Sequence, residues 1–211
     1  MDRFFCYISF VFLINLNMSI LDMIRSRRSV RSYKPDFLTD KQIKAILEAG
    51  MMAPSAHNHQ PWNFIVITNR DAINGLSASV QGYLLEKVSG ENAIADFGSE
   101  ERVERVKKRL ELKEDTVFYG APCVVLVVVE KDSAYAPIDC GMAAENMCLY
   151  AREQGIASCM IGYACHAARE ELISVGMKES QELMFGMVFG YSDQMDGEVD
   201  RDFNKIQKWL K

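Results

Sequence analysis

Hydrophobic residues recur at helical and strand-like spacings in irregular order along the chain. A helical pattern begins behind Thr39, whose Thr-Asp-Lys-Gln sequence fits a capping box, and should end near residues 50–54. Residues 64–67 and 183–191 favour strands, and the almost purely apolar run 122–129 is typical of a central strand covered on both faces. Further helices are predicted over 20–24, 71–116, 139–154 and 169–175. This order predicts an α+β or irregular α/β layer architecture without internal repeats.

Two of these helical segments carry additional signals. Asp139 is the predicted cap of helix 139–154, in which Gly141, Ala143 and Ala144 would permit close approach to neighbouring elements. Residues 100–114 are strongly charged, with valine and leucine recurring on one side. We interpret this segment as a solvated amphipathic helix and expect no chemistry there.

Length and composition favour one compact domain. The chain has 211 residues, 49% of them hydrophobic, which is enough for one sizeable core, so we predict a single domain over residues 18–211. A formal net charge of −5 argues against general nucleic-acid binding. Six cysteines show neither a Cys-x-x-Cys pair nor zinc-site spacing, and are interpreted as reduced, mostly buried thiols. We therefore expect a cytoplasmic protein.

Residues 4–16 are largely hydrophobic and follow the early charge pair Asp2 and Arg3. A signal peptide is one interpretation, but the start is nearly neutral, no small-residue cleavage site follows, and the run is too short to span a bilayer. We favour Met18 as the natural start, with residues 1–17 as an extension without a motif of its own. No membrane partner is expected.

Five basic residues and no acid lie between positions 25 and 34: Arg25, Arg27, Arg28, Arg31 and Lys34. Arginine presents a planar fork of donors that suits phosphate, and interleaved serines supply hydroxyls, so a cofactor with one phosphate would fit. A solvated loop after a helix is the alternative. The glycine-rich phosphate loops of other cofactor folds are absent, so any nucleotide phosphate must be bound by side chains.

The polar loop 53–62 joins the end of a helix to a strand, a position that commonly carries function. His57 and His59 suggest a metal, with His166 the only other histidine, but neighbouring carboxylate or cysteine ligands are lacking and no metal site is predicted. Trp62 is interpreted as a packing anchor. The hydrolase motif Gly-x-Ser-x-Gly is absent.

Three blocks in this order resemble the signatures of the nitroreductase superfamily. They are residues 27–33 (Arg-Arg-Ser-Val-Arg-Ser-Tyr), residues 53–62 (Ala-Pro-Ser, then Asn58 and Gln-Pro-Trp) and residues 155–162 (Gly-Ile-Ala-Ser-Cys-Met-Ile-Gly). The resemblance extends from about Met18 to Tyr191. It implies an α+β fold with a mostly antiparallel central sheet flanked by helices, and an intertwined homodimer with one FMN at each end of the interface.

The resemblance also implies which residues bind the flavin. The motif that holds its phosphate and ribityl chain is matched by Arg27, Arg28, Ser29 and Arg31. Arg31 is the candidate for a cation at the pyrimidine edge, where positive charge favours the reduced flavin. The loop that the partner subunit contributes is matched by Pro54, Ser55 and Asn58.

Two further matches complete this implied site. Ile161 and Gly162 match a segment whose backbone approaches the flavin N5 and O4 edge, where glycine permits close contact. Arg201 matches a late basic residue that completes the phosphate site, with a surface salt bridge as the alternative.

The function implied by this resemblance is a two-step oxidoreduction. NAD(P)H would give hydride to FMN, and a small organic acceptor (a nitroaromatic, quinone or flavin) would then take the electrons, with no obligatory catalytic side chain. A family relative acting as an enal reductase or dehalogenase would look similar. A non-catalytic flavin-binding or regulatory protein is the alternative from another class.

Overall fold

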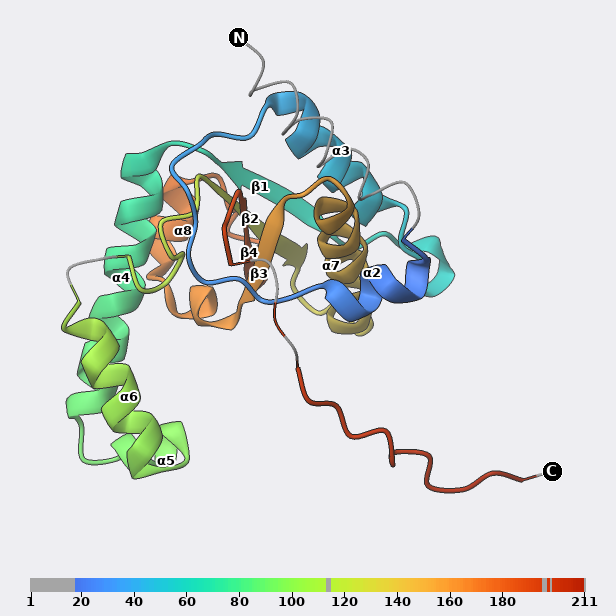
Figure 1. Ribbon diagram of the computed structural model, residues 1–211. Helices are drawn as coiled ribbons and strands as arrows, with labels where there is room; N and C mark the ends of the chain where they lie inside the picture. Colours follow the sequence, from blue (N-terminus) through green and yellow to red (C-terminus); the bar gives the residue numbers. More distant parts are fainter. Residues whose placement is uncertain (1–17, 113–114, 195–196, 198, 211) are drawn as a thin grey trace, which may run out of the picture.

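The computed structural model describes residues 18–112, 115–194, 197 and 199–210; the predicted extension 1–17 lies outside them (Figure 1). A four-stranded sheet forms the centre, in the order β1-β2-β4-β3 with every neighbouring pair antiparallel. Its strands are β1 Asn63–Ile67, β2 Cys123–Glu130, β3 Ala157–Ile161 and β4 Gln181–Gly190. The expected α+β fold with a mostly antiparallel sheet is confirmed.

The unbroken apolar sequence of β2 is explained by the helices that cover both faces of the sheet. Cys123, Val125 and Val127 pack with α3 (Asp40–Met51) and α7 (Ala136–Glu153) on one face. Val124, Leu126 and Val128 pack with α4 (Arg70–Ser89) and α8 (Arg169–Ser174) on the other. Successive side chains of a strand point to opposite faces, so a strand between two helical layers needs an apolar residue at every position.

Local signals predict the start of α3 and the end of α7, but not the start of α7. The capping box at Thr39 is present, and Gly155, with φ +70°, follows the end of α7. The prediction that Asp139 caps α7 was wrong. The helix begins three residues earlier, at Ala136, and has Pro137 in its first turn, a position that suits proline. Asp139 is instead buried and accepts a hydrogen bond from Ala56.

Close packing of α3 on α7 depends on a glycine of α3 rather than on Gly141. A Cβ added at Gly50 would lie 2.7 Å from Cγ of Met147, whereas one at Gly141 would meet nothing within 4 Å. Ala143 and Ala144 of α7 are buried, as predicted. The small residue that lets these two helices pack closely is thus Gly50 of α3 and not Gly141 of α7.

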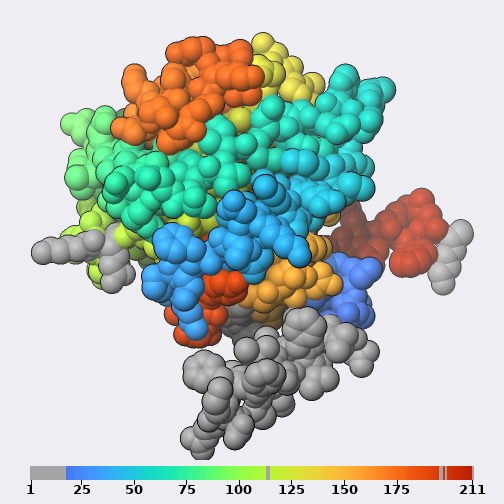
Figure 2. Space-filling view, turned by 90° about the horizontal axis from the view of Figure 1, so that it is seen from above, coloured from blue at the N-terminus to red at the C-terminus, as the bar shows by residue number. Residues whose placement is uncertain are grey.

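Two parts project from this layered body (Figure 1). The predicted helical region 71–116 divides into α4, α5 (Ala93–Phe97) and α6 (Glu100–Leu110), and the last two form an arm beside the end of α4. The described tail beyond residue 199 extends away from the body in both views (Figures 1 and 2). Short α2 (Ile20–Ser26) packs on α7 and buries none of its residues fully.

Cysteine placement agrees with the expectation of mostly buried thiols. Cys123, Cys140, Cys148 and Cys159 are free and buried, and Cys165 is free and exposed. Burial raises the pKa of the Cys140 and Cys148 thiols to about 11, so both are protonated at neutral pH. Within the described residues, none of the helices is both long and apolar enough to cross a membrane.

Candidate functional site

A cavity of about 450 Å³ opens where β3 ends and the short helix η3 (Gly162–His166) begins. We call it the Gly162 cavity; its lining includes Arg31, Arg109, Ile161, Gly162, Tyr163 and His166. A Cβ added at Gly162 would meet nothing within 4 Å, so the backbone there faces open space. The structure therefore brings three of the predicted site residues, Arg31, Ile161 and Gly162, to one cavity.

Another glycine holds η3 against the sheet. A Cβ at Gly186 of β4 would lie 2.9 Å from Cβ of Ala164, closer than real Cβ contacts. The missing side chain lets η3 lie flat on β4, which pairs with Ile161 at the same point. Gly186 thus helps to set the position of the Gly162 backbone, a role that no local pattern in the sequence indicates.

The Gly162 cavity carries positive charge that nothing in its described wall neutralises. Within the described part of the chain, Arg31 makes one side-chain hydrogen bond, from Nη1 to the Ser29 carbonyl at 3.2 Å. Arg109 of α6 donates to the Thr116 carbonyl and, at 3.0 Å, to the Tyr119 hydroxyl. Two cations without a lining carboxylate favour an anionic or electron-rich ligand.

Backbone pairing fixes the basic segment to the edge of the sheet. The amide of Val30 donates to the Ser158 carbonyl at 3.0 Å, and Ser29 forms a parallel bridge with Ser158 of β3. Val30 is buried, and the Tyr33 hydroxyl donates back to its carbonyl at 2.9 Å. These contacts fix the backbone on both sides of Ser29 and leave its neighbours Arg28 and Arg31 outside the core.

Arg27 and Arg28 have different environments. Nε of Arg27 is buried and makes no hydrogen bond to any described residue, although Oε1 of Glu145 lies 3.2 Å away as an ion pair. Arg28 donates to the carbonyls of Gly197, Arg25 and Arg27 at 2.6 to 2.7 Å. Arg27 thus keeps an unused donor, whereas Nε and Nη1 of Arg28 anchor the backbone around them.

Arg201 lies with Arg28 and apart from Arg31. A separate cavity of about 880 Å³ is lined by Arg25, Arg28 and Arg201, together with apolar residues of α2 and the tail. Within one chain, the predicted phosphate residues therefore lie in separate places, with Arg31 at the Gly162 cavity and Arg28 and Arg201 at this one. Arg28 also lines a small cavity together with Arg27.

The predicted partner-facing loop has a strained and well-anchored backbone. His57, Asn58 and Gln60 have φ of 52°, 57° and 47°. These values lie in the left-handed region of backbone conformation, which residues other than glycine rarely adopt. The Ser55 hydroxyl accepts from the Gln60 amide at 2.9 Å, and Asp139 accepts from the Ala56 amide at 3.3 Å. Such strain is typical of functional loops whose surroundings hold them in shape.

This loop does not meet the basic segment within one chain. Pro54, Ser55 and Asn58 line none of the cavities described above. The loop is tied to Asp139 in the first turns of α7, whereas Arg27 contacts Glu145 farther along the same helix. The two halves of the predicted site stay apart in the single chain.

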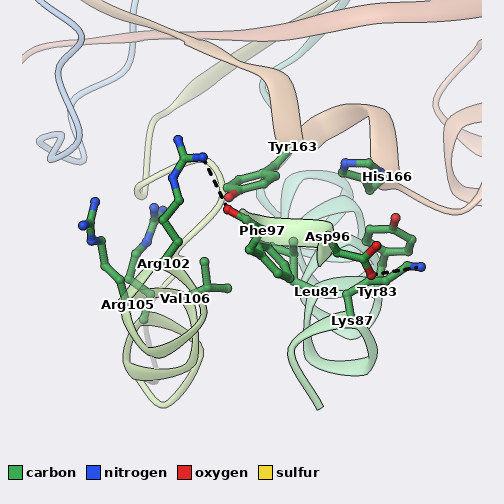
Figure 3. A pocket seen from close by; sticks show the side chains of 11 residues that line it. Tyr83, Leu84, Lys87, Asp96, Phe97, Arg102, Arg105, Val106, Tyr163 and His166 are labelled. Atoms are coloured by element: carbon green, nitrogen blue, oxygen red, sulfur yellow. Dashed lines mark hydrogen bonds and ion pairs between the residues drawn. The ribbon is translucent and has the colours of Figure 1, made fainter. Parts of the chain in front are cut away.

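Helix α6 carries candidate residues that the sequence interpretation missed. Arg102, Arg105 and Arg109 line a second cavity of about 420 Å³ between α4, α6 and η3, which we call the arm cavity (Figure 3). The expectation of no chemistry in residues 100–114 rested on charge and spacing, which do not show what a helix faces. Their spacing of three and four residues was the available signal, because it places the three on one helical face.

A stacked pair of rings lines the arm cavity, and its histidine also lines the Gly162 cavity. His166 lies flat on Tyr83, with ring centroids 4.4 Å apart and planes 8° apart. Partial burial, and then the charge of Lys87, lower the pKa of His166, so its ring is neutral at pH 7.

His57 and His59 lie together in the loop before β1, with 5.9 Å between their ring centroids. The histidines are thus divided between two parts of the molecule.

Replacement of Asp139 by alanine should loosen the strained loop. The Ala56 amide would lose its acceptor, so we expect its hydrogen exchange to accelerate roughly tenfold, equivalent to one lost hydrogen bond. Amide exchange followed by mass spectrometry or NMR measures this. The Ile46 amide in the core of α3 is the internal control, and equal exchange at Ala56 in both proteins would contradict the anchoring role.

Comparison with known proteins identifies this fold and sequence. The chain matches the Nitroreductase family over residues 24–191. It is 28% identical over 200 residues to nitroreductase NfnB of Mycolicibacterium smegmatis, covering 81% of this chain and 82% of the relative. A protein of Archaeoglobus fulgidus, provisionally named an NADH dehydrogenase/NAD(P)H nitroreductase, is 29% identical over 193 residues, covering 87% and 92%. A nitroreductase of Desulfitobacterium hafniense solved with bound FMN superimposes with a TM-score of 0.77 at 27% identity, covering 92% of this chain and all of that one. On this evidence the chain belongs to the nitroreductase family.

Proposed function

We propose that this protein is an FMN-dependent oxidoreductase that uses NAD(P)H to reduce a small organic acceptor. The observation that carries the proposal is the Gly162 cavity, where an open glycine backbone lies beside Arg31 and Arg109 without a lining carboxylate. The names of family relatives, which include bound FMN and NAD(P)H dependence, support the same chemistry.

The residues present fit an FMN. Arg27 is ion-paired with Glu145, but its buried Nε makes no hydrogen bond among the described residues, so a phosphate oxygen would be a suitable acceptor for it. Ser29 adds a hydroxyl from the same segment. Arg31 would lie at the pyrimidine edge, and the backbone of Ile161 and Gly162 would approach the reactive edge. Arg28 and Arg201 would complete the phosphate end.

Bound FMN would accept hydride from the nicotinamide and pass electrons to the acceptor, and the side chains would support this chemistry without reacting themselves. Arg31 supplies a fixed positive charge that stabilises the negative charge of a reduced flavin. Arg109 adds a second cation from the opposite wall. Gly162 leaves room for a planar ring against the backbone.

We further propose that the protein is a homodimer in which Pro54, Ser55 and Asn58 reach the flavin of the partner subunit. Support comes from the separation of this loop from Arg27 in one chain. It also comes from apolar surface that one chain leaves uncovered on α2 and the tail: Ile20, Leu21, Phe203, Ile206, Trp209 and Leu210. A second copy of the chain is the natural cover for such surface. The cytoplasmic location stays a prediction.

The purified protein should be yellow, and anaerobic addition of NADH or NADPH should bleach it. Readmission of an acceptor should restore the colour. If one site serves donor and acceptor in turn, double-reciprocal plots at several acceptor concentrations should be parallel. Absorbance titration and steady-state kinetics provide the measurements.

The same experiment separates the alternatives. A yellow protein that neither nucleotide bleaches would favour a non-catalytic flavin-binding protein, and a colourless protein that does not take up added FMN would contradict the proposal. Enals and halogenated aromatics tested as acceptors would reveal a reductase or dehalogenase with the same flavin site.

A further inference from the structure

The arm cavity adjoins the Gly162 cavity on the side of the projecting helices. Arg109, Tyr163 and His166 line both, so the two spaces meet at these three side chains. Figure 3 shows Arg102 and Arg105 on one side and Tyr83 and Lys87 on the other. Its volume of about 420 Å³ lies in the range of roughly 300 to 1,000 Å³ that is usual for ligand sites.

Positive charge dominates the wall of this cavity. Four cations line it (Lys87, Arg102, Arg105 and Arg109) against one carboxylate, Asp96. Asp96 lies 3.5 Å from Nζ of Lys87. Arg105 pairs with Glu101 at 2.6 Å, on the exposed surface of α6. Carboxylates therefore form ion pairs with only two of the four cations, Lys87 and Arg105.

The other two cations have no carboxylate partner among the described residues. Arg102 donates to the Phe97 carbonyl at 3.4 Å, the long dashed contact in Figure 3, and Arg109 bonds only neutral oxygens of Thr116 and Tyr119. Arginine at these positions keeps donors free for a planar anion. An acid-poor cluster next to a reaction site points to an anionic ligand.

The remaining wall suits an aromatic ring. Tyr83 and His166 stack 4.4 Å apart, the ring of Tyr163 stands 6.3 Å from His166, and Phe97 also lines the cavity. Flat apolar walls and a cationic rim in one small cavity match a ring that carries a negative group. A neutral acceptor would fill the same space but leave Arg102 without an ionic partner.

We propose that the arm cavity binds the anionic end of the electron acceptor, and that this protein prefers aromatic acceptors bearing a carboxylate to their neutral counterparts. The inference rests on the proposed function and specifies its acceptor class. Arg102 is the specificity residue that contacts the carboxylate, and Arg105, although paired with Glu101, adds positive charge to the same wall. Arg109 also holds the turn at Thr116 and is less suitable for substitution.

The test compares 4-nitrobenzoate with 4-nitrobenzamide, which has nearly the same shape and no charge. The unaltered protein should reduce the carboxylate with a kcat/KM about tenfold above that of the amide, and R102Q/R105Q should reduce this ratio to near one. Because both arginines are exposed, added salt should also weaken the preference. Calorimetric binding of each compound to the oxidised protein, without nucleotide, should show the same preference independently of turnover.

A matched control comes from the same helix. K107Q/K108Q removes the same charge from α6 at residues that do not line the cavity, and should leave the ratio unchanged. Equal use of both acceptors by the unaltered protein would overturn the inference while leaving the proposed function intact. Loss of NADPH reduction of the flavin in R102Q/R105Q, with the acceptor ratio unchanged, would also overturn it, since the anion would then be the nucleotide phosphate. Failure of the proposed function itself would appear separately, as a protein that neither nucleotide bleaches.

Discussion

Purified Pro54→Glu protein should carry roughly a tenth or less of the flavin bound by the unaltered protein, although Pro54 lines no cavity that contains Arg27 or Arg31. In the proposed dimer this exposed residue faces the partner's flavin, so a glutamate there would place bulk and negative charge against an anionic cofactor. Flavin released from a known amount of protein by heat measures the occupancy. His59→Glu, an exposed position in the same loop, is the matched control and should keep its flavin.

Mixing two damaged chains makes the result sharper. An Arg27→Ala chain and a Pro54→Glu chain, each with its own affinity tag, should both be flavin-poor as homodimers. Isolated heterodimers should contain one intact site and one site damaged twice, and should therefore recover one flavin per dimer. Heterodimers confirmed by native mass spectrometry but without flavin would show that each site is built from one chain.

Asp115→Ala should lower the free energy of unfolding by about 3 kcal/mol, because it strands several hydrogen-bond donors. One oxygen of Asp115 accepts from the Ser77 hydroxyl at 2.6 Å and from the amides of Val117 and Phe118 at 3.1 and 2.9 Å. Ser77, Val117 and Phe118 are buried, so water cannot replace the lost acceptor without rearrangement. Urea unfolding followed by circular dichroism measures the change.

Two companion variants establish the cause of this destabilisation. Asp115→Asn keeps one acceptor oxygen and should cost clearly less than alanine. Asp36→Ala removes a carboxylate at an exposed position and should change the free energy of unfolding by less than about 0.5 kcal/mol. An Asp115→Ala protein as stable as the Asp36→Ala protein would show that the turn at residues 115–120 is held by other contacts. Arg109 contacts the same turn, so its placement in the Gly162 cavity should also depend on Asp115.

The site could be predicted in part because some of its signals are local. An acid-free run of arginines and serines is visible without a structure, and so is Gly162 at the end of an apolar strand. The arginines of α6 were missed because their sequence is equally typical of a solvated face; only the position of η3 and α4 opposite them makes a cavity. Gly186 gave no signal, since its importance lies in a contact with Ala164, a residue distant in sequence.

The sequence by itself determined the elements, because the forces that define them act over a few residues. Thr39 caps the helix that its capping box predicts, and the apolar run of β2 requires cover on both faces. Asp139 shows the limit: its type and position suggested a cap, but burial beside Ala56 gave its carboxylate another donor. Only the tertiary structure decided that the basic segment pairs with β3, that Arg31 meets Gly162, and that the loop at Pro54 stays apart from Arg27. These outcomes depend on which surfaces, distant in sequence, pack together and exclude water. The spacing of residues along the chain does not specify that packing.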